Sequence, residues 1–262
     1  MDLDPIIRTG TRAAYEAGRI LNSHFGNITR IAKKGEIDLV TEADTASEAA
    51  IIEVIQKDFP GHTIQAEESG VHQGGDDGRW IVDPLDGTTN FAHRLGIYCV
   101  SIAFALGDRL LAGIVLNPAT GELFAATRDG GATLNNTPIR VTANAAMQEC
   151  LLATGFPYDI RRKSRIVLAR MERFLMASQG IRRLGAAALD LCHVACGRMD
   201  GFWEEGLKPW DMAAGALIVQ EAGGRVTDFR DEPYRLSQSD IVASNGLIHN
   251  EMITLLQPKD EL

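Results

Sequence analysis

The spacing of hydrophobic residues predicts two helices at the start of the chain. The first spans residues 4–25, with Asp4 as its N-cap and Pro5 at its first position. Its apolar residues fall on one helical face: Ile6, Ile7, Ala13, Ala14, Ala17, Ile20, Leu21 and Phe25. The second helix begins within residues 41–44 and runs to about Phe59. Between them, Lys33 and Lys34 are expected in a polar loop that contains glycine.

The middle of the chain has the alternation that is typical of strands. Long apolar runs at 96–106 and 109–117 flank Gly107 and Asp108, the expected turn of a hairpin. Shorter runs predict further strands at 62–66, 122–127, 132–134 and 138–141. We therefore expect a predominantly antiparallel sheet that is flanked by helices.

The second half alternates between the two kinds of element. Strands are predicted at 150–155, 181–184, 200–203, 225–228 and 241–243. Helices are predicted at 161–177, 186–196, 210–222 and 247–256. This alternation indicates a layered α/β fold. A chain of 262 residues forms one large domain or two closely packed halves. We expect an α+β half over residues 1–145 and an α/β half over 146–262, in one compact unit.

Composition excludes several classes of protein. The 45% hydrophobic and 23% charged content is that of an ordinary globular protein, and the net charge of −9 argues against a nucleic-acid partner. No apolar run is long enough to span a membrane, and the N-terminus lacks the pattern of a secretory signal. The cysteines are expected to be buried free thiols: Cys99, Cys150, Cys192 and Cys196. These features predict a cytoplasmic protein without a membrane partner.

The stretch from Trp80 to Phe91 carries the candidate chemistry. Asp83 and Asp86 follow three apolar residues that read as the end of a buried strand. Two carboxylates roughly 4 Å apart repel each other by about 4 kcal/mol at an effective dielectric near 20. A divalent cation removes that penalty, and oxygen ligands favour Mg²⁺. The alternative for an isolated pair is an ordinary Asx-type turn with solvated carboxylates.

A phosphate site is expected next to these carboxylates. Gly87 and Thr88 begin a turn into a helix, so their N–H groups form an anion site. Metal ligands beside a phosphate cradle indicate metal-assisted phosphoryl chemistry.

The longer pattern resembles the inositol monophosphatase family. Two motifs carry the resemblance, one over residues 80–91 and one over 210–215. Residues 38–44, 67–69 and 185–187 support it, so that it spans nearly the whole chain. The resemblance implies an α/β (α+β) fold, the layered α-β-α-β-α sandwich of the inositol monophosphatase and fructose-1,6-bisphosphatase type. It also implies a homodimer.

The resemblance implies a set of metal ligands. Glu67, Asp83 and the Leu85 carbonyl would bind the first Mg²⁺, and Asp83, Asp86 and Asp211 the second. Glu67 would also help to hold a third, weaker ion. Lithium would inhibit by competing at the second position.

Catalytic and substrate-binding roles are implied in the same way. Asp44 and Thr88 would orient and deprotonate a metal-activated water that attacks the phosphate directly. Gly87, Thr88 and Asp86 would surround the phosphate, and Ala187, Glu204 and Lys33 would complete the substrate site, with Lys34 an alternative to Lys33.

The substrate is expected to be a phosphorylated polyol or sugar. Glu204 stands seven residues before Asp211, where inositol-type members carry an acid that contacts a sugar hydroxyl. This favours inositol monophosphate over fructose 1,6-bisphosphate, with dual specificity as a further alternative. The basic cluster at 161–165 is either a solvated face or a second phosphate pocket.

A role of another class stays open. Some bacterial family members are partners of the transcription machinery. A binding module without catalysis would be expected to lose ligands, whereas this chain keeps every acidic ligand of the pattern.

Overall fold

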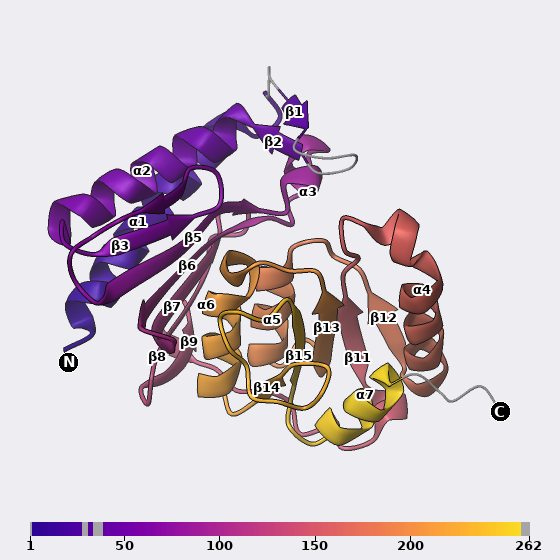
Figure 1. The fold of residues 1–262 in the computed structure, drawn as a ribbon. Helices are drawn as coiled ribbons and strands as arrows, with labels where there is room; N and C mark the ends of the chain where they lie inside the picture. Colours follow the sequence, from indigo (N-terminus) through magenta and orange to yellow (C-terminus); the bar gives the residue numbers. More distant parts are fainter. Residues whose placement is uncertain (1, 28–30, 34–38, 258–262) are drawn as a thin grey trace.

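The computed structural model describes residues 2–27, 31–33 and 39–257 and shows five alternating layers (Figure 1). Two helices cover the outer face of the first sheet: α1 (Asp4–His24) and α2 (Glu42–Asp58). Two more lie between the sheets: α5 (Ala187–Ala195) and α6 (Pro209–Glu221). The far face of the second sheet carries α4 (Ile160–Ala177) and α7 (His249–Leu256). The α-β-α-β-α sandwich expected from the sequence is confirmed.

The first sheet has eight strands in the order β10-β9-β8-β7-β6-β5-β3-β4. Their bounds are β3 (Thr63–Ala66), β4 (Gly70–His72), β5 (Gly78–Asp86), β6 (Cys99–Leu106), β7 (Arg109–Asn117), β8 (Glu122–Thr127), β9 (Gly131–Leu134) and β10 (Thr137–Pro138). Among the strands described for this sheet, only β3 and β5 run parallel to each other, so the prediction of a predominantly antiparallel sheet is confirmed. The strand expected at 138–141 is shorter and earlier than predicted.

A small ribbon corrects the prediction of a loop around Lys33. The strands β1 (Ile31–Lys33) and β2 (Leu39–Thr41) pair antiparallel, with Lys33 opposite Leu39. The predicted cap of α1 is also wrong, because the N-cap is Leu3 and Asp4 lies inside the helix.

The second sheet has five strands in the order β12-β11-β13-β15-β14. Their bounds are β11 (Leu151–Thr154), β12 (Gly180–Arg182), β13 (Gly201–Glu205), β14 (Arg225–Thr227) and β15 (Asp240–Ser244). The strand β11 runs parallel to its neighbours β12 and β13. The strand β15 runs antiparallel to its neighbours β13 and β14. The short helices α3 (Thr88–Ala92) and η1 (Met147–Glu149) complete the elements.

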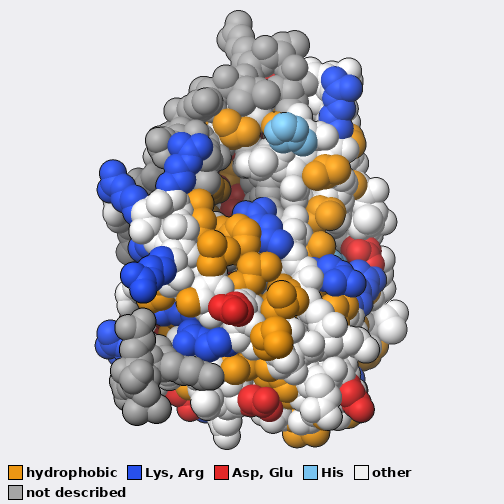
Figure 2. All heavy atoms as spheres, turned by 90° about the vertical axis from the view of Figure 1, so that its right-hand side faces the viewer, with side chains coloured by type: hydrophobic (Ala, Val, Ile, Leu, Met, Phe, Trp, Pro, Cys, Tyr) orange, Lys and Arg blue, Asp and Glu red, His pale blue; other side chains and the backbone are white. Residues whose placement is uncertain are grey.

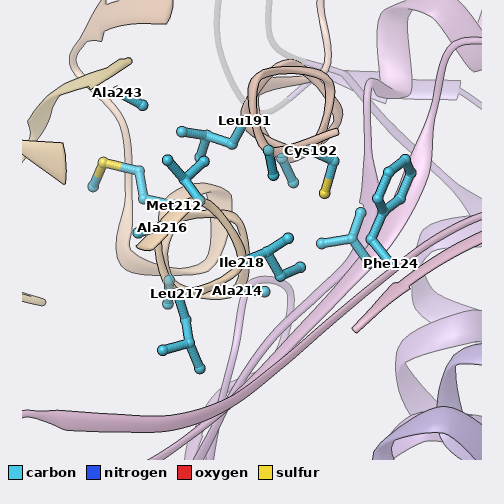
Figure 3. Close-up of a cluster of buried hydrophobic side chains, with 14 of the residues drawn as sticks. Phe124, Leu191, Cys192, Met212, Ala214, Ala216, Leu217, Ile218 and Ala243 are labelled. Carbon is cyan, nitrogen blue, oxygen red and sulfur yellow. The ribbon is translucent and has the colours of Figure 1, made fainter. Parts of the chain in front are cut away.

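The two central helices are buried on nearly every side because both sheets pack on them (Figure 3). In α6 every residue from Met212 to Val219 is buried. Small residues bring backbones close: a Cβ added to Gly113 on β7 would lie 2.7 Å from the carbonyl oxygen of Ala214. This close packing fixes the N-terminal ends of α5 and α6 relative to β5.

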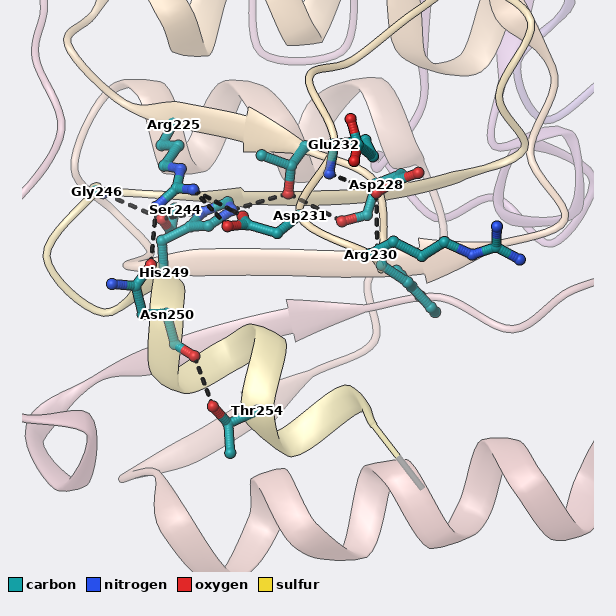
Figure 4. Close-up of polar contacts among 12 residues, drawn as sticks. Arg225, Asp228, Arg230, Asp231, Glu232, Ser244, Gly246, His249, Asn250 and Thr254 are labelled. Atoms are coloured by element: carbon teal, nitrogen blue, oxygen red, sulfur yellow. Dashed lines mark hydrogen bonds and ion pairs between the residues drawn. The ribbon is translucent and has the colours of Figure 1, made fainter. Parts of the chain in front are cut away.

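A buried polar network fixes α7 to the second sheet (Figure 4). The ring of His249 is fully buried and hydrogen-bonds with Ser244 Oγ at 2.8 Å and with Thr227 Oγ1 at 2.9 Å. Burial lowers its pKa to about 4, so the ring stays neutral at pH 7. Arg225 binds Asp231 through two contacts of 2.7 Å. No helix within the described ranges is long and apolar enough to cross a membrane.

Candidate active site

An irregularity in β5 turns two carboxylates to the same side of the first sheet. Asp83 pairs with Ser101 of β6, and the next pairing joins Asp86 to Cys99, three steps along β5 against two along β6. In a regular strand, residues three apart point to opposite faces, but the extra residue of a bulge restores a common face. The strand therefore does not end at Val82, as the sequence predicted, but continues through both acids.

Asp83 lies at the centre of a group of acids. It is buried, and its Oδ1 accepts a hydrogen bond from the Leu85 N–H at 2.9 Å. Burial raises its pKa well above the ordinary value, and a hydrogen bond with Glu67 and the charges of Asp86 and Asp211 raise it further. The four carboxyl groups are therefore close enough to interact.

Asp86 is held by the N-terminus of α5. Its Oδ2 accepts hydrogen bonds from the Ala188 N–H at 2.7 Å and from the Cys99 thiol at 3.7 Å. Burial raises its pKa to about 6 even though these donors act in the opposite direction. Asp86 thus links the first sheet to the central helices.

Asp211 approaches the same group from the first turn of α6. Its Oδ2 accepts the Lys208 N–H at 2.7 Å. Burial raises its pKa well above the ordinary value, and the negative charges of Asp86 and Glu67 add to the shift. A helix cap alone does not explain a carboxyl group that faces two other acids.

Glu67 follows β3, and an acid that the sequence analysis missed supports its turn. The Glu67 N–H donates to the Val82 carbonyl at 3.1 Å. The next two N–H groups, of Glu68 and Ser69, each donate to the buried carboxylate of Glu48 at 2.8 Å. Glu48 lies one turn after Asp44 on α2. Two acids four residues apart on a buried helical face were the signal that could have identified it.

Asp44 and Thr88 are in contact, as the family resemblance implied. Thr88 Oγ1 lies 3.2 Å from Asp44 Oδ1 and 3.0 Å from the Leu85 carbonyl oxygen. Asp44 also completes the capping box of α2, because its Oδ2 accepts the N–H and the hydroxyl of Thr41. Burial raises the pKa of Asp44, while the bonds from Thr41 oppose that shift.

The turn after β5 requires glycine. Gly87 has φ of 93°, and a Cβ there would lie 2.8 Å from the Ile97 carbonyl oxygen. The buried amide of Asn90 donates to Ile97 and to Leu184, at 2.8 Å each. These bonds hold α3 beside the loop that leads to Ala187.

A pocket opens above this turn. It is lined by Asp86, Gly87, Thr88, Thr89, Gly155, Phe156, Pro157, Tyr158, Arg183, Gly185, Ala187, Glu204, Gly206, Leu207 and Asp211. The proposed substrate residues Gly87, Ala187 and Glu204 therefore share one cavity. Burial raises the pKa of Glu204 to about 8, and Arg183 opposes that shift.

The cation in this wall is Arg183, which the sequence analysis missed although it stands two residues before Gly185. Its guanidinium lies over the Phe156 ring at 5.4 Å from the ring centroid. The basic cluster at 161–165 lies on the first turns of α4 and does not line the pocket. The backbone of Lys33 lies in β1, and its side chain and all of Lys34 lie outside what the structure describes.

In the part of the chain that the structure describes, no three His, Cys, Asp or Glu side chains already have the geometry of a metal site. The chemistry of the group nevertheless fits a hard cation. All of its side-chain ligand atoms are carboxylate oxygens. Asp83, Asp86 and Asp211 each accept a hydrogen bond from a backbone N–H through one of these oxygens. A bound cation would offset both the repulsion between these carboxylates and the cost of burying their charges.

Comparison with known proteins decides the family. The inositol monophosphatase family model matches residues 2–261. The chain belongs to the inositol monophosphatase family. It is 46% identical over 253 residues to an inositol-1-monophosphatase of Synechocystis, covering 96% of this chain and 88% of that protein. It is 43% identical over 259 residues to the Nus factor SuhB of Haemophilus influenzae, covering 98% and 97%.

A solved structure of a related protein has the same fold. The extragenic suppressor protein suhB of Bartonella henselae superposes with a TM-score of 0.94 at 39% identity, covering 98% of this chain and 99% of that one. As a member of the inositol monophosphatase family, the protein is a phosphatase that uses divalent metal and acts on a phosphorylated small molecule.

The acids of the site predict how stability depends on pH without metal. The folded-state pKa of Asp86, about 6, exceeds the ordinary 3.8. The folded protein therefore holds a proton that the unfolded chain releases between these values. In EDTA, the contribution of Asp86 to the free energy of unfolding should be largest below pH 4. It should fall as the pH rises through about 6. Denaturant unfolding measured from pH 4 to pH 8 checks this.

Bound metal and substitution of Asp86 should both reduce this dependence of stability on pH. Mg²⁺ at about 100 times its Kd should restore about 2.7 kcal/mol at pH 7. Asp86→Asn should make the curve shallower, because Asp83, Asp211 and Glu204 keep raised pKa values of the same sign. The matched variant Asp77→Asn, at an exposed carboxyl, should keep the wild-type slope. An Asp86→Asn curve with the wild-type slope would contradict the role given to this carboxyl.

Proposed function

We propose that the protein is a Mg²⁺-dependent phosphomonoester hydrolase whose main substrate is inositol 1-phosphate. The observation that carries the proposal is the group of interacting carboxyls beside Gly87 and Thr88, in a pocket that also contains Glu204. Oxygen-only donors favour Mg²⁺ among the metals of the cell. A relative at 46% identity bears the name inositol-1-monophosphatase.

The proposed ligands follow from the donors that face the group. Glu67, Asp83 and the Leu85 carbonyl would hold one ion, and Asp83, Asp86 and Asp211 a second. Glu67 would share a third, weaker ion. When bound, these ions supply Lewis acidity: they lower the pKa of water and neutralise charge on the phosphate and the leaving alkoxide.

The proposed base is the pair of Asp44 and Thr88. A hydroxyl has one proton, so Thr88 Oγ1 donates either to Asp44 Oδ1 or to the Leu85 carbonyl. When it donates to Asp44, its lone pairs accept a hydrogen bond from the attacking water and orient it. Burial raises the pKa of Asp44, which strengthens this carboxylate as a base. The N–H groups of Gly87 and Thr88 would bind the phosphate oxygens.

Polyol recognition is assigned to the opposite wall. Glu204 would bind a ring hydroxyl, Ala187 would form the adjoining wall, and Lys33 would approach from the ribbon β1–β2. For fructose 1,6-bisphosphate, the alternative substrate, Arg183 replaces the cluster at 161–165 as the candidate partner of a second phosphate, because Arg183 lines the pocket. The free thiols of Cys99, Cys150 and Cys192 are buried, whereas that of Cys196, also expected to be buried, is only partly so. Free thiols are consistent with a cytoplasmic location.

A homodimer is proposed on the outer face of α4. Figure 2 shows hydrophobic side chains gathered on this side of the molecule among basic ones. Those exposed on α4 are Ile166, Leu168, Leu175 and Met176, and the last is 82% exposed. Met176→Glu should weaken the dimer in light scattering, whereas Val71→Glu, at an exposed apolar residue of β4, should not. A wild-type monomer would contradict the proposal.

Phosphate release tests the function directly. With Mg²⁺, we expect the highest kcat/KM for D-myo-inositol 1-phosphate among a set that includes fructose 1,6-bisphosphate, adenosine 3′,5′-bisphosphate and NADP. EDTA should abolish release. Asp86→Asn should lower turnover by at least about 100-fold with the fold intact, because a proposed ligand is lost. Millimolar Li⁺ should inhibit, since it would compete at the second ion position.

The same assay separates the alternatives. Preference for fructose 1,6-bisphosphate would favour the second substrate and direct attention to Arg183. Wild-type rates in Asp86→Asn would contradict the metal assignment. If no compound released phosphate, a role as a partner of the transcription machinery would come first, which the name of the Haemophilus relative supports.

A further inference from the structure

The carboxylate of Glu204 lies over a residue that has no side chain. A Cβ added to Gly155 would come within 2.0 Å of Oε2, 2.1 Å of Oε1 and 2.1 Å of Cδ of Glu204. Real contacts of a Cβ are essentially never below 3.0 Å. Gly155 thus provides space that Glu204 occupies.

The fold brings these two residues together from distant parts of the chain. The strands β11 and β13 run parallel, with Thr154 opposite Trp203. The Thr154 hydroxyl fixes this register by donating to the Trp203 carbonyl at 2.8 Å. One residue further along the chain, Gly155 just past the end of β11 and Glu204 within β13 both line the pocket.

We propose that Gly155 is a positioning residue that sets where Glu204 meets the substrate, and that it thereby selects phosphorylated polyols over simple phosphate esters. This inference rests on the proposed function of the pocket. A side chain at position 155 would leave the backbone in place, because the atoms it meets belong to the end of a flexible side chain. The Glu204 carboxylate would instead move away from residue 155. Because Glu204 is only 9% exposed, few other positions can accommodate it.

Gly155→Ala should therefore change selectivity more than it changes the reaction. We expect kcat/KM for inositol 1-phosphate to fall by about 10- to 100-fold, the usual effect of misplacing a binding group by roughly 1 Å. The decrease for p-nitrophenyl phosphate, which has no polyol hydroxyl, should be at least ten times smaller. Gly75→Ala is the matched control, because an added Cβ there meets nothing within 4 Å.

A double-mutant cycle separates this role from general damage to the fold. Glu204→Asp shortens the side chain by one methylene group, which makes room for the methyl group added by Gly155→Ala. Gly155→Ala with Glu204→Asp should therefore be no worse than Glu204→Asp alone, a coupling expected only of residues in contact. Additive losses, or equal losses for both esters, would overturn the inference.

A crystal structure of Gly155→Ala tests the inference without turnover. The Glu204 carboxylate is expected to have left its position over residue 155. A carboxylate in its wild-type place would overturn the inference, whatever the substrate. In contrast, a wild-type enzyme that releases no phosphate from inositol 1-phosphate, combined with a displaced carboxylate, would count against the proposed function alone.

Discussion

Repulsion among buried carboxyl groups is the constraint on which the site depends. Burial raises the pKa of Asp83 well above its ordinary value, and the charges of acids from the turn after β3, from β5 and from α6 raise it further. The fold imposes this cost and partly offsets it, since Asp83, Asp86 and Asp211 each accept a backbone N–H. An acidic group that is held in this way favours a cation or a proton, and the family to which the chain belongs uses divalent metal.

Every layer of the sandwich except that of α4 and α7 contributes to the group of acids or to the pocket beside it. The first sheet supplies β5 with its bulge, and α2 supplies Asp44 and the supporting Glu48. The central helices supply the N–H that holds Asp86 and the carboxyl of Asp211. The second sheet supplies Glu204 to the pocket wall, where we propose that it binds the substrate. Because both sheets pack on α5 and α6, a change in that packing would move the acids relative to the pocket.

Local motifs made Asp83, Asp86 and the turn after them predictable from sequence. The roles of Glu67 and Asp211 and the pairing of Asp44 with Thr88 were expected only through the family resemblance. Features that depend on partners distant in the chain were not predictable. The bulge in β5 exists only relative to β6, and Gly155 is informative only because Glu204 packs on it. Basic residues 161–165 stand out in the sequence as a run, whereas among the residues that the structure describes it is Arg183 that brings a positive charge to the pocket wall. The division of the chain near residue 145 stays a prediction.

We propose that the acids around the end of β5 form a site for divalent metal. Crystals grown with Mn²⁺, which has the same preference for oxygen ligands, allow it to be tested by anomalous diffraction. We expect strong anomalous peaks among Glu67, Asp83, Asp86 and Asp211, with carboxylate oxygens within about 2.3 Å of each ion. Well-ordered crystals with no peak at this position, or with Mn²⁺ bound only elsewhere, would contradict it.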